Sequence, residues 1–139
     1  MSTQAAMLCS PLESLALEEL KRHRWIESEK ACCDLGDSAF VEWRKKYWAK
    51  WLRARVMEHL NGDFFWEEVD CDDFGLLQNN FHRNEVLLQE IVLRIKDGQE
   101  NLSIINWVID TDRSLQDALV ILRKIDINAR RIPCFRFIP

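Results

Sequence analysis

The segment 43–55 constrains the fold of this chain more than any other, because aromatic and basic side chains recur along it with the spacing of a helix. At about 100° per residue, its large apolar side chains fall on one broad face. That face consists of Phe40, Trp43, Tyr47, Trp48, Trp51, Leu52 and Ala54. We predict one helix over 38–60, capped by Asp37 or Ser38 and stopped at Gly62, where a left-handed residue can end it.

Five basic side chains of this helix are candidates for binding a partner. Lys46, Lys50 and Arg53 lie opposite the aromatic face, where they can contact the phosphates of a nucleic acid. Arg44 and Arg55 project within the aromatic face, where a guanidinium stacks on a ring, pairs with a carboxylate or stays exposed. Trp and Arg also dominate protein–protein hot spots, and tryptophans beside lysines suit a membrane surface. The alternative is that the tryptophans form the core and the basic residues are its solvated side.

An acidic loop follows this helix and offers an internal partner for the basic residues. Asp70, Asp72 and Asp73 lie close together in it, where they either pair with helix 38–60 or stay solvated. The formal net charge of the chain is −4 and its pI is about 5.4. Binding to nucleic acid would therefore require a segregated basic patch.

The first helix begins near residue 11. Ser10 can accept hydrogen bonds from the first-turn amides, Pro11 occupies a position that needs no amide hydrogen, and Glu13 can complete a capping box. The apolar face of this helix is not continued by the following residues. We therefore predict a bend or break around His23 and a second helical piece that stops at Gly36.

Two further helices are indicated by caps and by apolar stripes. Asn80 or Asn84 begins the first and Gly98 ends it, while Ser114 opens the second with a capping box. The inward-facing residues are Leu87, Leu88, Ile91, Val92 and Ile95 in the first helix, and Leu115, Ala118, Leu119, Leu122 and Ile125 in the second.

The segment 102–109 lies between these helices and is apolar on nearly all sides. Asn101 can cap it as a helix, and an element that is apolar all round is expected at the centre of a fold. Its β-branched residues leave a strand as the alternative.

Together these patterns predict an all-α protein, a single irregular or orthogonal helical bundle of five to seven helices. Hydrophobic residues make up 47% of the 139 residues, with only four Gly and three Pro, which argues against disorder and against a loop-rich sandwich. We assign residues 1–139 to one domain, with 1–9 disordered and 129–139 as an extended C-terminal tail. Phe135 and Phe137 in this tail are further candidates for partner binding.

The sequence contains no recognisable catalytic or metal-binding motif. It lacks Cys-x-x-Cys, His-x-x-x-His, Glu-x-x-His, Gly-x-Ser-x-Gly and a glycine-rich phosphate loop. The acidic loop is not a calcium loop, because Phe74 and Phe81 stand where oxygen ligands are required. We therefore predict a protein that is not an enzyme and that has no cofactor and no metal.

The five cysteines are odd in number and irregularly spaced, which favours reduced thiols. The first ten residues show no signal peptide, and no apolar run is long enough to span a bilayer. We expect a cytoplasmic protein.

Residues 101–131 resemble the last two helices of death-fold adaptor domains. The resemblance rests on Trp107 in one helix, a turn at Thr111, Asp112 and Arg113, and the pattern Ser114-Leu115-x-x-Ala118-Leu119-x-x-Leu122-Arg123-x-Ile125. It covers under a quarter of the chain. The resemblance implies assembly without catalysis, through charged faces of the bundle, and places no active-site residue here.

We therefore predict a non-enzymatic protein-interaction module of the adaptor or assembly type. Its expected partner is another protein or a second copy of the chain, and a membrane is not expected. The alternative is a small helical protein that binds nucleic acid through the basic aromatic helix 43–55.

Overall fold

The structure is a computed structural model that describes residues 9–132, and helices dominate it. The α-helices are α2 (Leu12–Ala31), α3 (Asp37–Lys46), α4 (Trp48–Asn61), α5 (Leu76–Phe81), α6 (Glu85–Lys96), α7 (Asn101–Asp110) and α8 (Leu115–Ile125). Short 3-10 helices are η1 (Cys71–Asp73), η2 (His82–Asn84) and η3 (Ile127–Ala129). Two strands of two residues, β1 (Cys9–Ser10) and β2 (Phe65–Trp66), pair in parallel. The predicted all-α class is confirmed.

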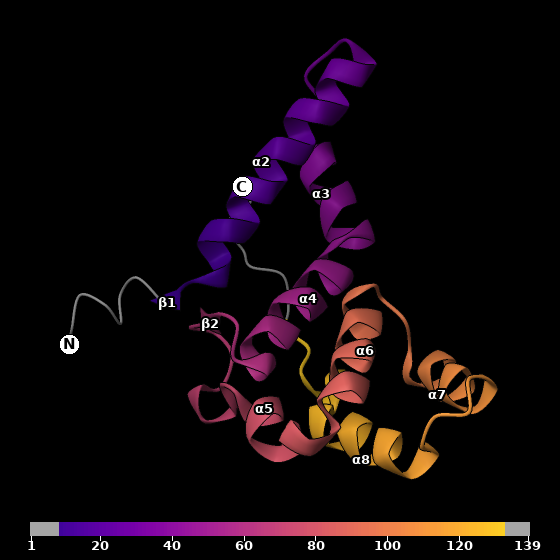
Figure 1. Cartoon of the computed structure of the whole chain (residues 1–139). Helices are drawn as coiled ribbons and strands as arrows, with labels where there is room; N and C mark the ends of the chain where they lie inside the picture. Colours follow the sequence, from indigo (N-terminus) through magenta and orange to yellow (C-terminus); the bar gives the residue numbers. More distant parts are fainter. Residues whose placement is uncertain (1–8, 133–139) are drawn as a thin grey trace.

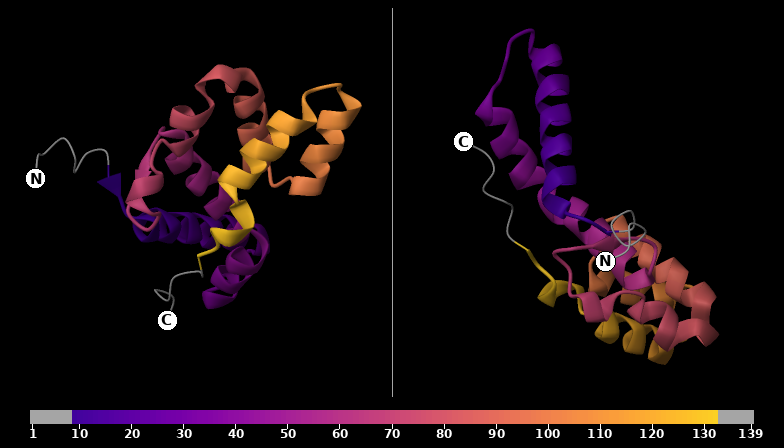
Figure 2. Two further views of the ribbon diagram at one scale, coloured as in Figure 1. Left: turned by 90° about the horizontal axis from the view of Figure 1, so that it is seen from below. Right: turned by 90° about the vertical axis from the view of Figure 1, so that its left-hand side faces the viewer.

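The helices form two parts that meet where α3 leads into α4. Figure 1 shows α2 and α3 as a hairpin that extends away from the other helices, and we call this hairpin the arm. We call the remaining helices, α4 to α8, the bundle. Figure 2 shows the same separation from two further directions. A single cluster of buried apolar side chains nevertheless extends from Leu12 and Leu20 in the arm to Ile125 and Ile127 at the end of the bundle.

The core of the bundle follows the apolar stripe that the sequence indicates for α6. Leu88, Ile91, Val92 and Ile95 are at most 1% exposed. Helix α4 also ends where predicted, because Gly62 adopts a left-handed φ of 82° as its C-cap. The predicted inward-facing stripe of α6 and the predicted end of α4 are therefore confirmed.

Helix α2 is continuous, so the predicted bend at His23 is wrong. The apolar face does not need to continue through Trp25, because this side chain is 66% exposed. The helix ends at Cys32, which adopts a left-handed φ of 59°. The amides of Cys32 and Cys33 donate to the carbonyls of Glu29 and Ser28, so the last turn is closed without a glycine.

The predicted helix 38–60 is divided at Tyr47, between α3 and α4. Tyr47 has φ −118° and ψ −21°, and its amide still donates to the carbonyl of Trp43 at 2.8 Å. In an unbroken helix, Trp43 and Trp48 would point about 140° apart around the axis. In the structure their ring centroids are 6.0 Å apart, and Trp51 lies 5.9 Å from Trp43 and 5.6 Å from Trp48. The break lets the three rings contact one another.

Helix α7 lies at the edge of the bundle, so its predicted central position is wrong, as is the strand alternative. Only Ile104 and Val108 of this helix are buried, whereas Leu102 and Ile109 are 69% and 56% exposed. Helix α7 is apolar on nearly all sides, and its hairpin partner α8 cannot cover all of them.

Helix α8 begins as predicted but buries a different set of residues. The Ser114 hydroxyl accepts from the Asp117 amide at 3.3 Å, which confirms the cap. The buried residues are Ala118, Ile121, Leu122 and Ile125, while Leu115 and Leu119 are more than a third exposed. The inward face is therefore rotated away from the predicted one.

The end of the described chain is attached to α4. The indole nitrogen of Trp48 donates to the carbonyl oxygen of Ile132 at 2.8 Å. Helix η3 includes Ala129, and residues 133–139 of the predicted tail, with Phe135 and Phe137, lie outside the described residues. Residues 1–8 also lie outside them, so the predicted disorder there stays a prediction.

The cap of α2 comes from a distant part of the chain, and the N-cap position lies one residue beyond the predicted Ser10. The N-cap position is Pro11, which makes no side-chain cap hydrogen bond. Instead, the Glu68 carboxylate accepts from the Leu12 amide at 2.8 Å and from the Glu13 amide at 3.3 Å. A carboxylate at this end of a helix also interacts favourably with the helix dipole.

We expect Glu68→Ala to lower the free energy of unfolding by about 1 to 2 kcal/mol, because it leaves two first-turn amides without their acceptor. Glu68→Gln keeps an acceptor and should cost less. Urea unfolding followed by circular dichroism measures both, with the exposed Glu18→Ala on the same helix as the control. An unchanged midpoint for Glu68→Ala would show that Glu68 does not cap α2.

Candidate functional site

The aromatic side of the segment 43–55 is part of the core. Trp43 and Trp48 are 4% and 8% exposed, and Trp51 is half-buried. Tyr47, at the break between the helices, is the most exposed ring of the segment, at 45%. Trp43 and Trp48 are therefore not available to a partner unless the junction of arm and bundle is disturbed.

Four of the five candidate cations lie against carboxylates of the same chain. Three of the pairs are Lys46 with Glu42 at 3.8 Å, Lys50 with Asp97 at 3.9 Å and Arg53 with Glu100 at 3.3 Å, and Arg55 pairs with Glu58. Arg55 also stacks on Trp51, with 5.4 Å between the guanidinium carbon and the ring centroid. Arg44 is exposed and has no ion-pair partner among residues 9–132. Exposed pairs of this kind add little stability, but they reduce the positive potential that a polyanion would meet.

The acidic loop docks on α4 differently from the prediction. Asp73 pairs with Arg130 at 2.5 Å, and the Asp70 carboxylate accepts from the amide of Asp72 at 3.0 Å. The loop contacts α4 through its backbone, because the carbonyl oxygen of Asp70 lies 2.9 Å from Nε2 of His59. Among residues 9–132, the carboxylates of Asp70, Asp72 and Asp73 form no ion pair with the basic residues of 43–55.

His59 is fully buried beneath this loop, and two backbone groups define its protonation. Its Nδ1 accepts from the amide of Trp66 at 3.0 Å, so Nε2 carries the proton and donates to Asp70. The rings of Phe65 and Phe74 cover it at centroid distances of 4.9 and 5.3 Å. Burial lowers the pKa of His59, because the charged form would lose its hydration. This histidine is a neutral structural link between α4, β2 and the acidic loop.

This arrangement predicts a loss of stability in mildly acidic solution. Below the ordinary histidine pKa of about 6.5, the unfolded chain takes up a proton that the folded chain does not. The free energy of unfolding therefore decreases as the pH is lowered. The slope contributed by one group reaches at most about 1.4 kcal/mol per pH unit. The loss ends once the pH falls below the lowered pKa of the folded state.

Urea unfolding between pH 7.5 and 5 measures this slope. We expect His59→Gln to be less stable at every pH but to lose the part of the slope that His59 contributes. The exposed His82→Gln should keep that slope. Equal slopes in the wild-type and His59→Gln proteins would contradict the assignment.

The main exposed apolar surface of the bundle lies on the hairpin of α7 and α8. We call it the hairpin stripe, and it consists of the exposed Leu102, Ile109, Leu115 and Leu119 together with the half-buried Ile105. The three α7 residues are spaced i, i+3, i+7 and therefore share one side of the helix. Ile105 and Leu119 line one shallow groove between the helices, which connects the two halves of the stripe. From the sequence pattern we predicted an interior position for all five residues.

The hairpin is held against α6 by a stacked cation cluster. The ring of Trp107 lies 3.7 Å from the guanidinium carbon of Arg94 and 4.5 Å from that of Arg113. Arg113 also donates two hydrogen bonds to the Glu90 carboxylate, at 2.6 and 3.1 Å. Planar guanidinium groups can stack and pair at the same time, so this cluster fixes how α7 presents the hairpin stripe.

Among residues 9–132, two groups of side chains each bring three potential metal ligands together. One consists of His23, Glu27 and Glu42, and the other of Asp70, Cys71 and Asp72. The first group was not predicted from the sequence, because Glu42 lies on α3 whereas His23 and Glu27 lie on α2. Its only sequence signal is the i, i+4 spacing of His23 and Glu27.

Among the described residues, no helix is both long enough and apolar enough to cross a bilayer. No family model, curated protein or solved structure matches this chain. The resemblance of residues 101–131 to death-fold adaptor domains stays a prediction.

Proposed function

We propose that this protein is a non-catalytic assembly module that pairs with a second copy of itself through the hairpin stripe. The observation that carries the proposal is the exposure of the stripe. Leu102 is 69% exposed, Ile109 is 56% exposed, and Leu115 and Leu119 are 37% and 38% exposed. Contiguous apolar patches on a folded domain mark interaction sites, because covering them removes apolar surface from water.

A second copy fits the form of this surface. Asn101 and Ile105 line the same groove as Arg123 and Asp126, so the start of α7 lies beside the end of α8. Two antiparallel hairpins that pack face to face make a four-helix arrangement, which buries both stripes at once. The same patch then serves both protomers about a two-fold axis, the commonest symmetry of soluble homo-oligomers.

The ion pairs of α4 favour a protein partner over a polyanion. Nucleic acid at Lys46, Lys50, Arg53 and Arg55 would have to displace a carboxylate from each of them. The formal net charge of −4 adds a general repulsion. Arg44 is the cation of this set that remains available to a partner.

The proposal keeps the assembly role that the death-fold resemblance implies but assigns it to an apolar surface. It also places the protein in the cytoplasm, where exposed thiols stay reduced. Cys32, Cys33 and Cys71 are free and exposed, which suits that environment.

Sedimentation velocity and light scattering test the proposal. We expect the wild-type chain to form a dimer with a dissociation constant in the micromolar range, which corresponds to about −8 kcal/mol. The double substitution Leu102→Glu and Ile109→Glu should give a monomer with unchanged helicity, because both side chains point away from the core.

Val86→Glu is the matched control. Val86 is an apolar residue of α6 that is 78% exposed and lies outside the stripe, so its substitution should leave the dimer intact. A wild-type chain that stays monomeric well above micromolar concentration would overturn self-association. Equal dissociation by Val86→Glu would remove the hairpin stripe as its site.

A further inference from the structure

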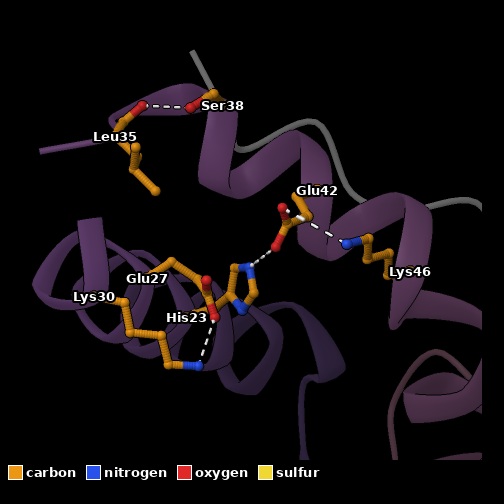
Figure 3. A network of polar contacts seen from close by, with 7 residues as sticks. All are labelled: His23, Glu27, Lys30, Leu35, Ser38, Glu42 and Lys46. Carbon is orange, nitrogen blue, oxygen red and sulfur yellow. Dashed lines mark hydrogen bonds and ion pairs between the residues drawn. The ribbon is translucent and has the colours of Figure 1, made fainter.

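We propose that His23, Glu27 and Glu42 form a site for a divalent transition-metal ion of the zinc class, which links α2 to α3 across the arm. The three ligand atoms lie within 4.8 Å of one another. Figure 3 shows His23 reaching from one helix toward Glu42 on the other, with the carboxylate of Glu27 beside the His23 ring. This site is independent of the hairpin stripe, which lies on α7 and α8.

The helical spacing explains why these side chains converge. His23 and Glu27 are four residues apart on α2, so they lie on the same face of the helix. Glu42 approaches from α3, and its Oε1 lies 3.0 Å from Nε2 of His23. Ligand atoms about 2.1 Å from a tetrahedral zinc ion lie about 3.4 Å from one another. The existing separations therefore require only small side-chain movements.

The imidazole is already oriented for this role. The side chain of His23 is 11% exposed, and its ring meets that of Tyr47 edge-on with centroids 5.5 Å apart. A ligand that is held in place before binding loses little conformational freedom on binding. The carboxylates of Glu27 and Glu42 are 30% and 40% exposed, so water can supply the remaining ligand.

Two lysines compete with the metal for the carboxylates. Lys30 lies 3.4 Å from Glu27, and Lys46 lies 3.8 Å from Glu42. The two lysine side chains are 70% and 63% exposed, so they can swing into water at little cost. A divalent ion would then neutralise the two carboxylates that the lysines release.

The donor set indicates the class of metal. One imidazole and two carboxylates, without a thiolate, suit Zn²⁺ and Co²⁺ better than Ca²⁺, which prefers oxygen ligands alone. The other group, Asp70, Cys71 and Asp72, is exposed and contains no histidine. Its Asp70 carboxylate already accepts from the Asp72 amide, so it serves here as a control.

Cobalt titration of the full chain tests the site, because the d–d absorption of Co²⁺ reports its ligands. We expect one ion per chain, displacement by Zn²⁺, and no thiolate charge-transfer band. Loss of a metal ligand should weaken binding by at least about tenfold. His23→Gln, Glu27→Gln and Glu42→Gln should each do so, while His82→Gln and Asp72→Asn should bind as the wild type does.

A thermal melt gives a second measurement. Bound Zn²⁺ should raise the unfolding midpoint of the wild-type protein and of Asp72→Asn, but not that of His23→Gln. Circular dichroism in the absence of metal checks that each variant is folded. The proposal is overturned if no ion binds, if binding survives His23→Gln and Glu42→Gln, or if a thiolate band appears and is lost in Cys32→Ser and Cys33→Ser.

Discussion

The rings of Trp43, Trp48 and Trp51 contact one another where the arm meets the bundle, and the rest of the structure depends on this contact. The break at Tyr47 brings the rings together, because a straight helix would direct Trp43 and Trp48 to different sides. Trp48 also holds the end of the described chain through the carbonyl of Ile132. The cluster therefore joins the arm, the bundle and the C-terminal segment in one core.

This placement decides which surfaces remain for function. Because the tryptophans are buried, the segment 43–55 presents mainly cations to solvent, and four of these already have carboxylate neighbours. The main exposed apolar surface of the bundle lies instead on α7 and α8, outside the segment that first suggested a binding site. The arm contributes something different, a polar cluster between two helices that is suited to a metal ion. The two proposals concern separate parts of the molecule, so either can fail without the other.

The sequence predicts local features well and distant ones poorly. Gly62 and Ser114 act as predicted because a helix stop or cap depends on neighbouring residues alone. The cap by Glu68 and the approach of Glu42 to His23 depend on how the chain folds back, which no local pattern contains. The exposure of α7 was missed for a related reason. Periodicity shows which sides of a helix are apolar, but the number of neighbouring helices determines how many of those sides are covered.

The most direct test of whether the tryptophans of 43–55 form the core is urea unfolding of two variants, Trp48→Ala and Trp25→Ala. Removing a buried tryptophan costs about 3 to 5 kcal/mol, whereas a substitution at an exposed position usually changes stability by about 0.5 kcal/mol or less. Trp48 is 8% exposed and Trp25 is 66% exposed. The account predicts a large loss for Trp48→Ala and a small change for Trp25→Ala. Equal and small effects would contradict it, because Trp48 would then lie on a surface and not in the core.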